Sequence, residues 1–243
     1  MRVRCFECPL RRRRAFKPKT ETEVGFLDAL KRDHLSVPPG TELIQQGQED
    51  ADLYTLFSGW AFRFKTLPDG RRQILHFLLP GDFIGLQGAM FDASLHGVET
   101  LTDAEFCVFP RRRVWSLFEQ VPQLAFEVSW LGAHEESMVD ENLVSVGLRN
   151  AGERVAALIL MLHRRCRTLD LVAPDNSIPF PLNQGHIADA LGLSLVHTNK
   201  TIARLRRLGL FAQSNGRLTL LNPKVMERLA QYYEDEPAPR PII

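Results

Sequence analysis

The most reactive side chains in this chain are four cysteines, Cys5, Cys8, Cys107 and Cys166. Cys5 and Cys8 form a C-x-x-C pair ahead of four consecutive arginines. Clustered thiolates can hold zinc or an iron–sulfur cluster, or take part in redox chemistry. The pair could equally be redox-inert, with Cys107 and Cys166 as small buried hydrophobic residues. Four cysteines with one close pair do not form a secreted disulfide framework, so we expect a cytoplasmic protein.

No arrangement of side chains in the sequence indicates catalysis. There is no nucleophile–base motif, no phosphate-binding glycine loop and no H-E-x-x-H, and His76, His96 and His134 are scattered. No apolar run is long enough to span a membrane. The basic N-terminus is not followed by the apolar stretch of a signal peptide. We therefore expect neither an enzyme nor a membrane partner.

Residues 181–210 predict two short helices joined by a tight turn. Asn183 is a good N-cap for the first helix, and Gly192 can end it in a left-handed conformation. Ser194 can cap the second helix, and Gly209 follows its last turn. The buried faces are predicted from apolar spacing: Ile187, Ala188 and Leu191 in the first helix, and Thr198, Ile202 and Leu205 in the second. This is the helix-turn-helix pattern, although simple helix packing is an alternative.

The segment after these helices supports a nucleic-acid interpretation. Residues 211–221 contain two strand-like runs around Asn215-Gly216, which predicts a β-hairpin. Helix-turn-helix and hairpin together make a winged helix, whose partner is double-stranded DNA. Residues 1–146 carry a net charge of −4 and residues 147–243 a net charge of +5. Chance could produce this imbalance, but its direction suits phosphate contact.

The first half of the chain predicts an antiparallel β-structure. From about Leu35, glycines recur about eleven residues apart between short apolar runs such as 52–57, 61–66 and 73–79. Regular short strands punctuated by Gly and Pro indicate a sandwich or barrel. Residues 105–109 are the last good strand.

Residues 121–148 predict one long helix. A near-heptad seam runs along it, which favours a two-stranded coiled coil between two copies. Packing on the β-structure of the same chain is the alternative. Two carboxylates on or beside the seam would meet their equivalents across a two-fold axis. Their repulsion disfavours the dimer unless a shift in helix position or protonation relieves it. The candidate dimerisation residues are Val128, Leu131, Glu135, Glu136, Val139, Leu143 and Val146.

In its order of elements the chain resembles the Crp/Fnr family of bacterial transcription regulators. Three segments carry the resemblance: Leu78-x-Pro80-Gly81-Asp82-Phe83, Asn150-Ala-Gly-Glu-Arg-Val155 and Ile187-Ala-Asp-Ala-Leu-Gly-Leu-Ser194. The match covers roughly residues 20 to 225. It implies an α+β fold: a cyclic-nucleotide-binding-like antiparallel β-barrel (jelly roll), a long dimerisation helix and a C-terminal winged helix-turn-helix. It also implies a homodimer that binds a two-fold symmetric DNA site, contacts RNA polymerase and responds to a signal in its N-terminal half.

The predicted parts have the following boundaries. Residues 1–20 are a basic, Cys-containing segment in which charge and Pro9 and Pro18 argue against a packed element. Residues 21–120 form the sensor barrel, 121–148 the dimerisation helix, and 149–225 the DNA-binding domain with a Pro-rich loop at 173–181. Residues 226–243 are a last helix and a disordered tail.

The candidate DNA-binding surface departs from the family pattern. The family's base-reading Glu and Arg are replaced by Val196 and Lys200. Val can contact a thymine methyl, Asn can pair with adenine and Lys can donate to guanine. Packing of Leu195 and Val196 inside the domain is the alternative. The complete candidate set is Gln184, Ser194, Leu195, Val196, His197, Asn199, Lys200 and Arg204, with Gln184 and Ser194 on phosphates.

The candidate effector pocket comprises Gly81, Asp82, Phe83 and His96. In nucleotide-binding members of the family, an Arg–Ser pair holds the cyclic phosphate. Here no arginine lies between Arg72 and Arg111, and a buried phosphate without a guanidinium would be poorly compensated. Cyclic nucleotide is therefore not the expected cofactor, and the sequence names no other effector.

The cysteines are closer to the Fnr branch of the family than to the cyclic-AMP receptor proteins. In that branch, clustered N-terminal cysteines and one in the last barrel strand hold an iron–sulfur cluster. Cys5, Cys8 and Cys107 match three such positions, and the remaining one falls near Arg14, which cannot be a ligand. The resemblance thus implies an oxygen or redox sensor with an iron–sulfur cluster or metal at these three cysteines, as the alternative to an unknown effector.

Overall fold

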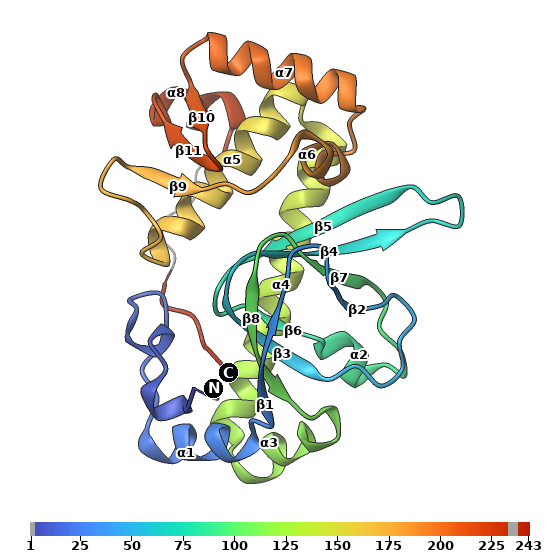
Figure 1. The fold of residues 1–243 in the computed structure, drawn as a ribbon, viewed down its shortest axis with the longest axis vertical. Coiled ribbons are helices and arrows are strands. Elements are labelled where there is room, and N and C mark those ends of the chain that lie inside the picture. The colour runs from blue at the N-terminus through green and yellow to red at the C-terminus, as the bar shows by residue number, and fades with distance from the viewer. Residues whose placement is uncertain (1–2, 233–237) are drawn as a thin grey trace. The chain divides into compact units, whose positions relative to one another are not determined.

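The structure is a computed structural model that describes residues 3–232 and 238–243. The chain divides into two compact units (Figure 1). Unit 1 contains the described residues of 1–72, 76–137 and 239–243, and unit 2 contains those of 73–75 and 138–238. The chain therefore leaves unit 1 twice, briefly at residues 73–75 and again from residue 138, and its last five residues belong to unit 1.

Unit 1 is built on two four-stranded sheets with strand orders β1-β8-β3-β6 and β2-β7-β4-β5. The strands are β1 (Asp33–Val37), β2 (Glu42–Ile44), β3 (Leu53–Ser58), β4 (Ala61–Thr66), β5 (Arg72–Leu78), β6 (Phe83–Ile84), β7 (Gly97–Thr100) and β8 (Ala104–Phe109). Neighbours pair antiparallel, as β1 does with β8 and β4 with β7. The predicted antiparallel jelly roll is confirmed, but its strands form two sheets and do not close into one barrel.

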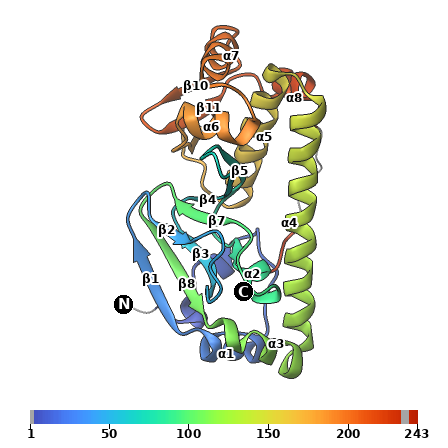
Figure 2. The ribbon, with the colours of Figure 1, turned by 90° about the vertical axis from the view of Figure 1, so that its right-hand side faces the viewer.

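Strand β8 shows how the sequence pattern builds two cores. Its side chains alternate, as a strand requires. Phe106 and Val108 join the apolar cluster that contains residues of both sheets. Cys107 and Phe109 point to the other side, into a cluster with residues of α1 (Glu21–Leu30), α3 (Trp115–Gln120) and α4 (Pro122–Leu148). Figure 2 shows α1 and α3 at the end of this sheet and α4 as one continuous helix. The short helix α2 (Leu86–Met90) follows β6.

Both ends of the chain pack in unit 1, which corrects two predictions. Residues 3–18 were not expected to pack, yet they form 3-10 turns at Cys5–Glu7 and Leu10–Arg12 and bury Leu10 and Phe16. The tail was expected to be disordered; its residues 234–237 lie outside the described residues, but Ile242 and Ile243 are buried. In both segments a few apolar side chains stand among basic or proline residues. Their burial outweighs the charge density on which the predictions rested.

Unit 2 contains the predicted winged helix with one additional strand. Its elements after α4 are α5 (Ala151–Thr168), β9 (Ser177–Pro179), α6 (Gln184–Leu191), α7 (Leu195–Arg207), β10 (Phe211–Ser214), β11 (Arg217–Leu220) and α8 (Pro223–Ala230). The segment predicted as a Pro-rich loop contains β9, which pairs with β11 in a sheet of order β10-β11-β9. Pro179 is tolerated there because β9 is an edge strand. Within the described residues, no helix has the length and apolar character needed to cross a membrane.

Candidate functional site

The helix-turn-helix is held by local contacts that the sequence predicted. Asn183 Oδ1 accepts a hydrogen bond from the His186 N–H at 2.8 Å, at the start of α6. Gly192 ends α6 with φ +62°. Ser194 Oγ accepts from the His197 N–H at 3.3 Å and caps α7. Each such cap is worth about 1 kcal/mol. The turn is therefore fixed by its own residues, and it positions α7 at the outer edge of unit 2 (Figure 1).

The two faces of α7 are chemically distinct. Thr198, Ile202 and Leu205 are buried, as predicted. Leu195 and Val196 are 52% and 64% exposed, which excludes the alternative that they pack inside the domain. Seven of the eight candidate DNA-binding residues are exposed: Gln184, Ser194, Leu195, Val196, His197, Lys200 and Arg204. The structure thus leaves these seven side chains on the accessible surface of unit 2.

Asn199 is the exception among the eight candidates. It is half-buried, and its Oδ1 is buried without a hydrogen-bond partner among the described residues. A bidentate contact with adenine needs both the oxygen and the nitrogen of the amide. Contact of Asn199 with a base therefore requires its side chain to rotate outward.

Basic side chains and the wing complete this surface. Besides Lys200 and Arg204, α7 carries exposed Arg206 and Arg207 near its C-terminal end, and the sequence interpretation did not select these two. Strands β10 and β11 pair from Phe211↔Leu220 to Ser214↔Arg217. Their two-residue turn has Asn215 at φ +49° and Gly216 at φ +69°, as a type I′ hairpin requires. The predicted hairpin is confirmed.

The candidate dimerisation seam on α4 is partly occupied by the chain itself. Val128 and Leu131 are 1% and 4% exposed and belong to the core of unit 1. Glu135 is also turned inward and forms an ion pair with Arg63, 2.9 Å from Nη1 to Oε2. The prediction that Val128 and Leu131 face a second copy is wrong, because the helix packs them on its own sheet. For Glu135, whose side chain is 19% exposed, it stays a prediction. For this first part of α4, the alternative of packing on the same chain is correct.

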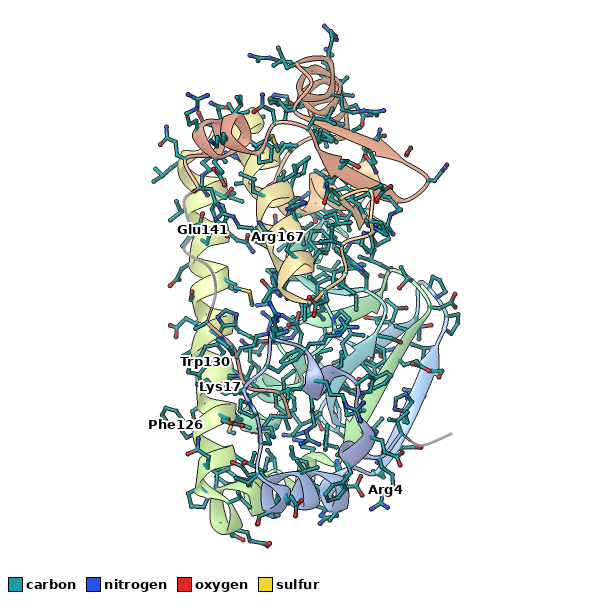
Figure 3. The ribbon with its side chains drawn as sticks, turned by 90° about the vertical axis from the view of Figure 1, so that its left-hand side faces the viewer. Arg4, Lys17, Phe126, Trp130, Glu141 and Arg167 are labelled. Carbon is teal, nitrogen blue, oxygen red and sulfur yellow. The ribbon has the colours of Figure 1, made fainter. Side chains whose placement is uncertain are left out.

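The rest of the seam remains accessible. Val139 and Leu143 are exposed, as is Glu136, while Val146 is half-buried. Further exposed apolar residues on α4 that the seam did not include are Phe126, Val144 and Leu148. Figure 3 shows Phe126 pointing away from unit 1, and Lys17 beside Trp130, with 5.8 Å between Nζ and the ring centroid. Among the described residues, several apolar side chains of α4 are therefore left exposed.

The four candidate effector residues are all buried or enclosed, but they have different surroundings. Asp82 forms an ion pair with Arg240, and Phe83 belongs to the same apolar cluster as Cys107. His96 Nδ1 lies 3.1 Å from Gln87 Oε1. Burial, together with the nearby Arg63 and Lys65, lowers the pKa of His96 to about 4. The structure therefore places a buried arginine, Arg63, close to His96. The sequence did not suggest Arg63 as a pocket residue, because it lies on β4, ahead of the arginine-free segment between Arg72 and Arg111.

The three candidate metal-binding cysteines do meet. Cys5, Cys8 and Cys107 line one cavity of unit 1, of about 30 Å³. Burial raises the pKa of Cys5 to about 12 and raises that of Cys107. Without a metal, burial therefore favours the thiol form of both side chains. Cys166 lies buried in α5 of unit 2, where burial raises its pKa to about 12.

This geometry does not fit a metal centre. Over residues 3–232 and 238–243, no group of three or more His, Cys, Asp or Glu side chains is arranged to hold a metal ion. The cavity also has room for only about two water molecules. We therefore derive no function through an iron–sulfur cluster or metal, and binding by these cysteines stays a prediction.

The two units match two family models. Residues 34–121 match the cyclic nucleotide-binding domain, and residues 153–229 match the Crp-like helix-turn-helix domain. A jelly-roll sensor domain, a long helix and a winged helix with an exposed reading helix define the class of DNA-binding transcription regulators.

Comparison with known proteins places the chain within this class. It is 32% identical to the nitrogen fixation regulation protein FixK of Bradyrhizobium diazoefficiens, over 93% of both chains. It is 30% identical to the transcriptional activatory protein AadR of Rhodopseudomonas palustris, over 81% of each. The solved structure of FixK2 from Bradyrhizobium japonicum aligns with a TM-score of 0.74 at 24% identity, covering 83% of this chain and 98% of that one. The chain belongs to the Crp/Fnr family of transcription regulators, which are not enzymes.

Proposed function

We propose that this regulator acts as a cytoplasmic homodimer that binds a two-fold symmetric operator, one α7 in each half-site. The observation that carries the proposal is the face of α7 with Val196, Lys200 and Arg204 exposed over a buried face of Thr198, Ile202 and Leu205. Such a helix reads base edges in the major groove, while neighbouring basic and hydroxyl groups bind phosphates.

The exposed apolar face of α4 supports the homodimer. Leu143 and Leu148 are 71% and 84% exposed, and Val139 and Val144 are exposed on the same helix. A soluble chain rarely leaves such a face uncovered, and a second α4 offers the same face by symmetry. Glu135 presents no obstacle to this dimer, because Arg63 neutralises it within the chain.

The half-site differs from the usual family consensus, because Val196 and Lys200 stand where the family has Glu and Arg. The signal enters through unit 1, and cyclic AMP is not that signal. Arg63, the buried guanidinium near His96, is already paired with Glu135. A cyclic phosphate would have to break this pair. On the operator, the dimer contacts RNA polymerase, as the regulators of this family do.

Selection of binding sites from random duplex DNA, with the purified full chain, tests the proposal. We expect an inverted repeat with half-sites about one helical turn apart. Light scattering of the complex should give two chains per site. A single asymmetric half-site bound by one chain would refute the dimeric mode. Calorimetric titration with cyclic AMP should give no heat of binding.

A further inference from the structure

The last five residues of the chain are bound by unit 1. The stretch between, residues 138–238, belongs to unit 2 apart from its undescribed part. Ile242 and Ile243 are 4% and 7% exposed. Ile243 packs in the apolar cluster that also contains Leu27, Cys107 and Phe109. Because both isoleucines are buried, this peptide packs on unit 1 in the way that a bound peptide ligand would.

Polar contacts fix the same peptide at Arg240. Its backbone N–H donates to Ala15 O at 2.8 Å, and its carbonyl accepts from the Lys17 N–H at 2.9 Å, forming a bridge beside Phe16. Its guanidinium forms an ion pair with Asp82, 2.8 Å from Nη2 to Oδ1. The same group donates to the carbonyls of Pro80 and Gly81 at 3.3 Å.

Gly81 makes room for this contact. Its φ is +88°, and a Cβ built on it would lie 2.2 Å from Phe16 Cζ and 3.3 Å from Arg240 Nη2. A side chain at this position would therefore collide with Phe16 and crowd Arg240. In this chain, the turn that resembles the family's effector-pocket turn packs at Gly81 against Phe16 and Arg240.

The terminal residue ends inside a cavity of suitable chemistry. The hydroxyl of Thr55 donates to Ile243 O at 2.5 Å, and Thr55 is itself buried. The cavity beside Ile243 is lined by apolar side chains and by two buried lysines, Lys19 and Lys31. The site thus suits a peptide with two adjacent aliphatic side chains.

The cavity that the peptide closes is the one lined by Cys5, Cys8 and Cys107. With Ile242 and Ile243 in place, it holds about two water molecules. Any larger molecule that enters along this path must displace the peptide.

We propose that unit 1 carries a binding site for the chain's own C-terminal peptide, Arg240–Ile243, and that the docked peptide seals the cysteine-lined cavity. The proposal does not depend on dimerisation or on the operator. It assigns the site a ligand class: a short peptide with an arginine two residues before a pair of adjacent aliphatic residues.

Alkylation of Cys107 by iodoacetamide, followed by mass spectrometry of the full chain, tests the seal. A variant that ends at Ala238, and the variant Ile242→Asp, should alkylate Cys107 at least ~10-fold faster, because the buried isoleucines no longer cover it. Pro239→Ala is the matched control, since Pro239 is exposed in the same peptide, and it should leave the rate unchanged. An unchanged rate in the truncated chain would overturn the proposal.

Two further measurements exclude unfolding as the cause. Cys166 is 0% exposed in unit 2, so its alkylation rate should stay constant when only the peptide leaves. The synthetic peptide Pro-Arg-Pro-Ile-Ile should restore protection of Cys107 in the truncated chain, and the same peptide ending in two aspartates should not. Failure of the first peptide to protect a truncated chain whose Cys166 remains unreactive would contradict the site.

A variant-free experiment covers the case in which truncation unfolds the protein. The backbone N–H of Arg240, which donates to Ala15 O, should exchange its hydrogen at least ~10-fold more slowly in the native full chain than in the chain in urea, since a docked peptide must open before exchange. Equal rates would show that Arg240–Ile243 is not docked and would refute the proposal.

Discussion

Arg63 on β4 and Glu135 on α4 form an ion pair in unit 1, with 2.9 Å between Nη1 and Oε2. The side chain of Arg63 is 5% exposed and that of Glu135 is 19% exposed. The pair therefore connects β4, whose Arg63 lies near His96, to the long helix α4. A buried guanidinium keeps its charge, so its carboxylate partner is what makes its burial tolerable.

Removing Glu135 should therefore destabilise unit 1. We expect Glu135→Ala to lower its free energy of unfolding by about 2 kcal/mol, because the charge of Arg63 would be left buried without this partner. Urea unfolding followed by tryptophan fluorescence measures this, since Trp60, Trp115 and Trp130 all lie in unit 1. Glu136→Ala is the matched control, because Glu136 is exposed, and it should change the free energy by less than about 0.5 kcal/mol. Equal effects of the two substitutions would contradict the role of the pair.

The reading face of α7 gives a prediction about DNA affinity. Lys200→Ala should weaken binding to the selected operator by about 5- to 100-fold at fixed salt, and should relax the preference at one base pair of each half-site. Quantitative gel shifts on the operator and on single-base variants measure both effects. Lys224→Ala removes the same charge from an exposed position on α8, and should leave the base preference intact. Unchanged operator affinity in Lys200→Ala would remove Lys200 from the reading surface.

The exposed face of α4 gives a prediction about oligomeric state. Leu143→Asp should raise the dimer dissociation constant by about 10-fold or more, because a two-fold axis places two charges in one apolar interface. Sedimentation velocity over a range of concentrations measures the shift toward monomer. Leu67→Asp makes the same change at an exposed leucine in the β4–β5 turn and should have no effect. A dimer that survives Leu143→Asp unchanged would place the interface elsewhere.

The sequence predicted best what is determined locally. Asn183, Gly192 and Ser194 act on backbone groups within a few residues, so their types and spacing specify the turn between α6 and α7. The hairpin at Asn215-Gly216 and the alternation in β8 are local in the same way. The overall order of elements followed from these units and from the resemblance.

The sequence failed where distant residues decide the outcome. On α4, the period of apolar residues is the same for a partner helix and for the chain's own sheet, so Val128 and Leu131 were placed on the wrong face. Arg63 pairs with Glu135, which is 72 positions away in the sequence, and Thr55 donates to Ile243, which is 188 positions away. Such contacts leave no spacing signal. Two isoleucines after a Pro-rich stretch gave too little pattern to predict burial.

The metal-binding interpretation of the cysteines can be tested directly. If Cys5, Cys8 and Cys107 hold a cluster or metal, the protein should carry iron and sulfide, or zinc, in about stoichiometric amounts after strictly anaerobic purification. Elemental analysis and an absorption spectrum measure this. Cys107→Ser provides the comparison. A coloured wild-type protein that loses its iron in Cys107→Ser would restore the cluster interpretation.

The buried His96 predicts that unit 1 loses stability in mild acid. Burial and the positive charges of Arg63 and Lys65 lower its pKa to about 4 from the ordinary histidine value of 6.5. Between these two values the unfolded chain binds a proton that the folded chain does not, so stability is complete above about pH 6.5 and falls as the pH approaches 4. For this one group, the loss between pH 7 and pH 5 is about 2 kcal/mol.

His96→Gln keeps a hydrogen-bonding side chain beside Gln87 but cannot be protonated, so its urea midpoint, followed by tryptophan fluorescence, should fall less over this interval than that of the wild type. The pKa of His34 is also lowered, by burial and by Lys31, and this contribution cancels in the comparison because both proteins contain it. His197→Gln, a substitution at an exposed residue of unit 2, should reproduce the wild-type curve. If wild type and His96→Gln lose the same stability between pH 7 and pH 5, His96 is not the group that makes unit 1 sensitive to acid.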